Sequence, residues 1–197
     1  MVLRPKANFD LARKLREQGV TLGDLFTFLS GLYFRGKLAY ASAFADPPEG
    51  CPGILVITPC KGLLAPETLV GASDLRRFAA SGVGKDVAAY TTPFSRDARR
   101  LAACVGEATR IILLGSIATG KYAKILLDSF GERLHFPRDF VGRGDMSRGG
   151  LLLRRAFDRQ ELEYVPMKGA VVHGKKPPKL NPRRYPRPIP SGDKERA

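Results

Sequence analysis

Residues 111–124, IILLGSIATGKYAK, decide the fold class that we expect for this chain. Four consecutive apolar residues at 111–114 predict a strand that is buried on both faces. A turn at Gly115 and Ser116 then leads into apolar residues at helical spacing, starting from Ile117. A strand, a glycine turn and a helix form a unit that directs backbone N–H groups and a positive helix end toward an anion. The stretch therefore predicts an α/β domain with a phosphate or nucleotide site at Gly115 and Ser116.

The length and composition indicate one globular domain. The chain has 197 residues, 44% of them hydrophobic, which is enough for one substantial core but short for two domains. No apolar run approaches the roughly 20 residues that span a bilayer. Residues 1–14 lack the apolar segment of a secretory signal. We therefore expect a cytoplasmic protein without a membrane partner.

The cysteines and histidines are few. Cys51, Cys60 and Cys104 form no Cys-x-x-Cys pair, and the chain has two histidines. A structural zinc site or a disulfide framework is typically built from more of these residues at closer spacing. We therefore expect free, reduced thiols, no metal site and no cofactor.

The net charge indicates a polyanionic partner. Lys and Arg number 33 against 19 Asp and Glu, which gives a formal charge of +14. Residues 174–197 contribute +6 and the preceding residues keep +8, so the excess does not depend on the C-terminal segment. We expect nucleic acid, either RNA or DNA, or a nucleotide as the partner. The alternative is a proteome that is basic throughout, and the oligomeric state is not predicted.

The N-terminal section, residues 1–45, is expected to be helical. Residues 8–18 predict a helix capped by Asn8. Thr21 and Asp24 resemble a capping box ahead of a densely apolar segment, which Gly31 and Gly36 are expected to divide into two packed helical pieces.

Residues 46–110 predict a strand and two helices. The strand covers residues 54–57 and ends at Pro59, and in an open α/β sheet the turn that follows it would lie at the ligand-binding edge. One short helix reaches residue 80. Residues 81–93 are expected to form a loop, after which Ser95 caps a second helix that ends near Cys104.

The C-terminal third contains predicted strands and a tail. Residues 134–136 predict a short strand ended by Pro137, and the apolar stretches 151–157 and 161–167 predict a β-hairpin. From Gly174 the sequence is rich in proline and basic residues, which predicts a disordered tail over residues 174–197.

Residues 142–150, GRGDMSRGG, are the most function-like segment. Glycines allow the backbone to approach a ligand, while Arg143 and Arg148 can bind a phosphate with planar, charge-assisted hydrogen bonds. We expect Ser147 to take part in phosphate or base binding, and Asp145 to act as a general base or to orient an arginine. The alternative is a solvated loop with an internal Asp–Arg pair.

Residues 115–121 match the GxxxxGK spacing of a phosphate-binding P-loop. Tyr122 stands where that motif needs Ser or Thr to hold magnesium. We therefore expect no nucleotide hydrolysis, and a degenerate P-loop is a minor alternative.

Cys60 is a candidate nucleophile. It follows the predicted strand at 54–57, and Lys61 next to it would lower the pKa of its thiol. The alternative is a buried, inert cysteine, which is the commoner case.

The Thr58-Pro59-Cys60 turn after a strand, the Gly115-Ser116 turn and a loop near Asp145 together resemble the uracil-DNA glycosylase-like α/β superfamily. Within it, the chain is most similar to the domain that accompanies archaeosine synthase and related base-modification proteins. The resemblance covers residues 50–155 and implies a fold suited to binding nucleobases or phosphates. It departs from the glycosylases in lacking a carboxylate in the first turn and a histidine in the late loop.

Together these features predict a single α/β domain over residues 1–173. We expect three layers with a mainly parallel central sheet, the helical N-terminal section, the C-terminal β-hairpin and the basic tail. The predicted function is nucleic-acid or nucleotide binding at the strand ends, with base or nucleotide processing left open. The alternatives are a non-catalytic RNA-binding module and a small-molecule phosphate-ester enzyme.

Overall fold

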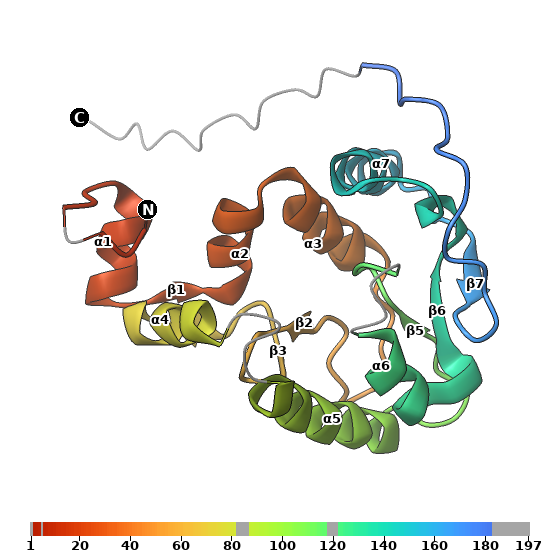
Figure 1. Cartoon of the computed structure of the whole chain (residues 1–197), viewed down its shortest axis with the longest axis horizontal. Coiled ribbons are helices and arrows are strands. Elements are labelled where there is room, and N and C mark those ends of the chain that lie inside the picture. The colour runs from red at the N-terminus through yellow and green to blue at the C-terminus, as the bar shows by residue number, and fades with distance from the viewer. Residues whose placement is uncertain (1, 5, 82–86, 118–121, 183–197) are drawn as a thin grey trace, which may run out of the picture.

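A computed structural model describes residues 2–4, 6–81, 87–117 and 122–182 (Figure 1). In this part the chain forms seven α-helices, seven short strands and two single-turn 3₁₀ helices. The α/β class is therefore confirmed. None of the described helices is long and apolar enough to cross a membrane.

The N-terminal section is helical, as predicted. It consists of α1 (Asp10–Glu17), the short β1 (Val20–Thr21), α2 (Leu22–Ser30) and α3 (Leu32–Phe44). The predicted cap at Thr21 is confirmed, because its hydroxyl oxygen accepts a hydrogen bond of 3.1 Å from the Asp24 amide. The predicted cap at Asn8 is wrong: Phe9 occupies the N-cap position of α1 and makes no side-chain cap.

Gly31 and Gly36 have different roles. Gly31 separates α2 from α3 and has a positive φ of 59°, a conformation that suits glycine. Gly36 does not interrupt a helix, contrary to the prediction. It lies inside α3, where the backbone of α7 approaches it closely.

The predicted strand at 54–57 forms half of an antiparallel hairpin. It is observed as β2 (Val56–Ile57), which pairs with β3 (Leu63–Leu64). The buried Thr58 closes the turn, since its hydroxyl donates to the Gly62 carbonyl at 2.9 Å and accepts from the Lys61 amide at 2.9 Å. Residues 58–62 are therefore a hairpin turn and do not follow a strand of a parallel sheet.

A second antiparallel pair lies near the N-terminus, where β4 (Leu69–Val70) joins β1. It leads into α4 (Ala72–Ala80), whose first turn is held by Asp74 accepting from the Gly71 amide at 3.0 Å. α1, α2, α4 and the β1–β4 pair share the N-terminal hydrophobic cluster, on the left in Figure 1.

The helix α5 (Val87–Cys104) is longer than predicted. The expected loop is wrong from Val87 onward, and Ser95 is an interior residue and not a cap. Pro93 lies inside the helix even though it lacks an N–H donor. Tyr90, Phe94 and Ala98 are spaced by one turn and buried, so the packing of this face offsets the cost of the proline.

The strand, turn and helix predicted from residue 111 onward occur in that order. β5 (Ile111–Ile112) is followed by the turn at Gly115 and later by α6 (Ala123–Phe130). Ile117 is a bend and not part of a helix. The P-loop match extends through residues 118–121, which lie outside the described residues.

The largest sheet in the described part of the chain has three strands. β6 (Leu134–Pro137), which the 3₁₀ helix η1 (Gly131–Arg133) precedes, pairs in parallel with β5 and antiparallel with β7 (Tyr164–Pro166). It is the only described sheet with a parallel pairing. The prediction of a mainly parallel sheet is therefore wrong for the described strands.

The function-like segment 142–150 is mostly helical. After the 3₁₀ helix η2 (Arg138–Phe140), a short loop leads into α7 (Asp145–Asp158). This helix includes residues 151–157, so the predicted C-terminal hairpin is wrong. Leu151 and Leu152 are buried in the larger hydrophobic cluster, and packing against α3 favours a helix over an extended strand (Figure 1).

The start of the predicted tail lies against the domain. Residues 170–182 form no regular secondary structure, but Val172 and Leu180 pack against the larger hydrophobic cluster. Arg154 of α7 also donates to the Asn181 carbonyl. The ordered part of the chain therefore extends beyond residue 173, and residues 183–197 lie outside the described part.

Candidate anion-binding site

Tyr33 of α3 connects the turn after β5 with the start of α7. Its hydroxyl lies 3.0 Å from the Leu114 carbonyl oxygen and 3.3 Å from that of Gly115. Burial raises the pKa of this hydroxyl to about 12, while the adjacent Arg148 guanidinium opposes the rise. The turn at Gly115 and the segment 142–150, both predicted as candidate sites, therefore meet around Tyr33.

Arg148 is a buried cation, with 6% of its surface exposed. Its Nε and Nη2 donate to the Phe140 carbonyl oxygen at 3.3 and 2.9 Å, and its guanidinium carbon lies 5.2 Å from the centre of the Phe140 ring. Nη1 is 3.9 Å from a carboxylate oxygen of Asp145. Arg148 therefore holds the start of α7 against η2, which leaves few of its donors for a ligand.

Asp145 is the first residue of α7, and 70% of its side chain is exposed. Its charge raises the pKa of the Tyr33 hydroxyl and of the Lys37 ammonium, and at Lys37 this opposes the effect of burial. The expected partnership of Asp145 with an arginine is present in the ion pair with Arg148.

Arg143 lies in the short loop before α7. Its Nη1 donates to the Ser147 hydroxyl oxygen at 3.3 Å. Its Nε is buried and finds no hydrogen-bond partner among the described residues. A buried N–H group without a partner is costly, so this guanidinium retains capacity to donate to a ligand.

Lys37 lies one helical turn after Tyr33 on α3 and is partly buried. Its ammonium nitrogen is 4.4 Å from the centre of the Tyr33 ring and 5.3 Å from that of Phe34. Burial lowers the pKa of the ammonium, and Asp145 opposes that shift. Tyr33 and Lys37 were not predicted as site residues from the sequence, although their i, i+4 spacing places them on one helix face.

Gly115 and Ser116 lie at the edge of this cluster. The Gly115 carbonyl oxygen contacts Tyr33, and Ser116 follows it as a partly buried residue. Through the Tyr33 hydroxyl, Gly115 is linked to Arg148, and Ser116 is the next residue in the chain.

Cys60 belongs to another part of the fold. It packs against the N-terminal hydrophobic cluster, whereas Phe140 and the buried part of α7 belong to the larger one. Its neighbour Lys61 forms an ion pair of 2.6 Å with Asp74. Cys60 and Asp145 are therefore not brought together among the described contacts.

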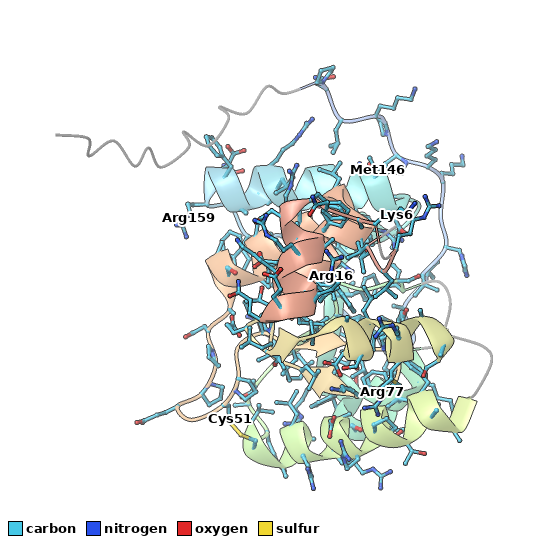
Figure 2. All side chains as sticks on the ribbon, turned by 90° about the vertical axis from the view of Figure 1, so that its left-hand side faces the viewer. Lys6, Arg16, Cys51, Arg77, Met146 and Arg159 are labelled. Atoms are coloured by element: carbon cyan, nitrogen blue, oxygen red, sulfur yellow. A yellow bond between two sulfur atoms is a disulfide. The ribbon has the colours of Figure 1, made fainter. Side chains whose placement is uncertain are left out.

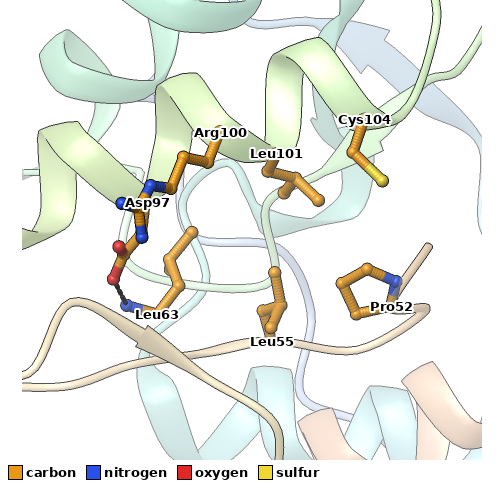
Figure 3. A pocket seen from close by; sticks show the side chains of 7 residues that line it. All are labelled: Pro52, Leu55, Leu63, Asp97, Arg100, Leu101 and Cys104. Carbon is orange, nitrogen blue, oxygen red and sulfur yellow. Dashed lines mark hydrogen bonds between the residues drawn. The ribbon is translucent and has the colours of Figure 1, made fainter.

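A shallow groove of about 230 Å³ lies between α5 and the loop that follows α3. Figure 3 shows that its lining is mostly apolar, with Arg100 and Asp97 at one end. Asp97 is engaged in the fold, because it accepts from the Leu63 amide at 3.1 Å and pairs with Arg96 at 2.8 Å. The groove thus lacks the converging free polar groups of a specific site.

Two of the three cysteines form a disulfide. Cys51, in the loop after α3, is bonded to Cys104 at the end of α5 (Figure 2). The prediction of free thiols is therefore wrong for this pair and holds for Cys60.

Comparisons of the chain with protein-family models, with curated proteins and with solved structures found no match.

Proposed function

We propose that this protein binds nucleic acid or a nucleotide, with its phosphate or base site where the turn after β5 meets the start of α7. The observation that carries the proposal is the contact of Tyr33 with the Leu114 and Gly115 carbonyls, next to Arg148. Through Tyr33, this contact links Arg148 of the Gly-rich segment to a strand-end turn, which supports the proposed location. Such a turn is a common place for ligands in α/β folds.

The distribution of charge supports a polyanionic ligand. The formal charge is +14, and Arg76, Arg77, Arg99 and Arg100 are exposed without forming an ion pair in the described part of the chain. Figure 2 shows Lys6, Arg16 and Arg77 on the face that carries α1 and α4. Exposed, unpaired cations attract phosphate backbones over long distances and release counterions when they bind.

A base- or nucleotide-processing enzyme is the second candidate. It is favoured by the exposed carboxylate of Asp145, whose charge acts on the Lys37 ammonium and the Tyr33 hydroxyl. The resemblance to the uracil-DNA glycosylase-like superfamily, the three-layer arrangement and the cytoplasmic location stay predictions that belong to the same proposal.

Titration of labelled RNA, DNA and mononucleotides with the purified protein tests the proposal. We expect binding that weakens as salt rises. Arg143→Ala should lower the affinity about tenfold or more, the amount expected for one charge-assisted contact. Arg155→Ala is the matched control, because Arg155 lies in the last turn of α7 and donates to Gln160.

The absence of binding to all of these ligands at low salt would overturn the proposed function. Equal effects of Arg143→Ala and Arg155→Ala would contradict the proposed location of the site.

A further inference from the structure

The junction of α3 and α7 contains three cations and one carboxylate. Arg148 is satisfied by the Phe140 carbonyl and Asp145, and one end of Arg143 is occupied by Ser147. Lys37 differs from both arginines. Among the described residues, its ammonium contacts aromatic ring faces but has neither a hydrogen-bond acceptor nor an ion-pair partner.

This arrangement is unusual for a lysine. A long charged side chain normally covers apolar surface with its methylene groups and keeps the ammonium in water. The Lys37 ammonium instead lies over the Tyr33 ring and is partly withdrawn from solvent. The rings compensate only a part of the lost hydration, because a cation–π contact is weaker than the full hydration of an ammonium group. An anion is the partner that would supply the rest.

We propose that Lys37 is the residue that contacts a phosphate group of the ligand, held in position by the Tyr33 ring. This inference rests on the proposed function and names the phosphate as the recognised chemistry. Lys37 suits a phosphate because an ammonium acts as a compact point charge with three donors and does not require a planar acceptor. Arg148 is then a positioning residue, because it holds the start of α7 beside Tyr33 and Lys37.

The surroundings of Lys37 explain why an anion would be bound there and not excluded. Among the described residues, Asp145 is the carboxylate whose charge acts on Lys37, and most of that side chain is in water, where its repulsion of a bound phosphate is screened. The Tyr33 hydroxyl is directed to backbone carbonyls and does not compete for the ammonium. Lys37 is thus a preorganised donor with remaining hydrogen-bonding capacity.

Calorimetric titration with inorganic phosphate, a 5′-mononucleotide and a single-stranded oligonucleotide tests the inference. Lys37→Met keeps most of the apolar length and removes the charge. We expect it to weaken binding of the phosphate-bearing ligand about tenfold or more, with Lys37→Arg recovering part of the loss. Arg35→Met is the matched control, because Arg35 is an exposed cation of the same helix.

Stability and pH separate a ligand contact from a structural role. Because Lys37→Met removes a partly desolvated charge, its unfolding midpoint should equal or exceed that of the wild type. Binding should also disappear, as pH rises, at a lower pH than an ordinary lysine would give, and this dependence should be absent in Lys37→Met.

The outcomes distinguish the inference from the proposed function. If Lys37→Met and Arg35→Met bind every phosphate ligand as tightly as the wild type, the role of Lys37 is refuted. If Arg143→Ala then still abolishes binding of the oligonucleotide, the proposed function holds without a role for Lys37. Conversely, phosphate binding that depends on Lys37, without any binding of nucleotides or nucleic acid, would support the phosphate contact and refute the proposed function.

Discussion

Gly36 of α3 and Gly149 of α7 bring the two helix backbones into contact. A Cβ atom added at Gly36 would lie 2.6 Å from the Gly149 carbonyl oxygen, and one added at Gly149 would lie 2.7 Å from the Tyr33 Cα. Any larger residue would therefore force the helices apart. The same contact sets the position of Tyr33 beside Arg148, so helix packing and the candidate site depend on one pair of glycines.

Alanine at Gly36 should destabilise the protein. Overpacking a close contact typically costs about 1–3 kcal/mol, and here the neighbouring atoms are backbone, which cannot rotate away. Gly150→Ala is the control, because its Cβ would meet only Leu180 at 3.6 Å and alanine favours a helix by roughly 1 kcal/mol. Urea unfolding of both variants measures the difference. Equal midpoints for Gly36→Ala and the wild type would show that the helices separate without cost.

A hydrogen-bonded pair of tyrosines joins α3 to the C-terminal strand. The Tyr40 hydroxyl oxygen accepts from the buried Leu162 amide at 2.7 Å and lies 2.7 Å from the Tyr164 hydroxyl. Tyr40→Phe leaves the Leu162 N–H without its partner, which should cost about 1–3 kcal/mol. Tyr164→Phe leaves that bond in place and should cost less. The order of the two unfolding free energies checks the prediction, and the reverse order would contradict it.

The local features of the fold were predictable from sequence. Thr21 and Asp24 define a cap within four residues, and the apolar run before Gly115 defines a strand and a turn. Both signals depend only on neighbours in the chain. Their success shows that these segments have local preferences that agree with the tertiary structure.

The errors have a common physical origin in long-range packing. Gly149 permits a close helix contact and Pro93 is tolerated in a helix with one buried face, but in a sequence both indicate a loop. The position of Tyr33 next to Gly115 and Arg148, and the bond between Cys51 and Cys104, join residues that are distant in the chain. No pattern of spacing carries this information, so Tyr33 and Lys37 could not be recognised as site residues.

The free energy of unfolding should fall in alkaline solution, because several tyrosines lose their protons at a higher pH in the folded state than in the unfolded chain. Burial raises the pKa of Tyr33 to about 12 and also raises the pKa values of Tyr90 and Tyr164. In the unfolded chain these groups lose their protons near pH 10. The stabilisation is therefore complete below pH about 10 and is lost as pH rises toward the folded pKa values, by about 1.4 kcal/mol per pH unit for each such tyrosine.

Urea unfolding at a series of alkaline pH values measures this loss. Tyr33→Phe should reduce the slope above pH about 10, because it removes one of these groups. The lowered pKa of Lys37 acts in the opposite direction, since its charge is penalised only in the folded state. Comparing Tyr33→Phe with the unchanged Tyr33 in proteins that also carry Lys37→Met removes the contribution of Lys37 to the slope. A slope that Tyr33→Phe leaves unchanged would show that Tyr33 titrates normally.

The disulfide between Cys51 and Cys104 should stabilise the fold. It closes a segment with a sequence separation of 53, and a crosslink of this kind typically contributes about 2–4 kcal/mol. A reductant should lower the thermal midpoint of the wild type, whereas Cys104→Ser should start from the lower midpoint and not respond. Cys60→Ser is the control and should keep the full response. Three reactive thiols in the denatured, unreduced chain would contradict the bond.

Truncation of the C-terminal segment should have two distinct effects. A Cβ at Gly142 would lie 2.2 Å from the Lys175 carbonyl oxygen, and Leu180 packs on the larger hydrophobic cluster, so residues 174–182 cover part of the domain next to α7. Deletion of residues 174–197 should lower the thermal midpoint, because it exposes the apolar surface under Leu180.

Deletion of residues 183–197 alone removes a polar, proline-rich sequence with a net charge of +3. This shorter deletion should leave the midpoint nearly unchanged and weaken the salt dependence of nucleic-acid binding. Equal midpoints for the two truncated proteins would show that residues 174–182 contribute nothing to stability.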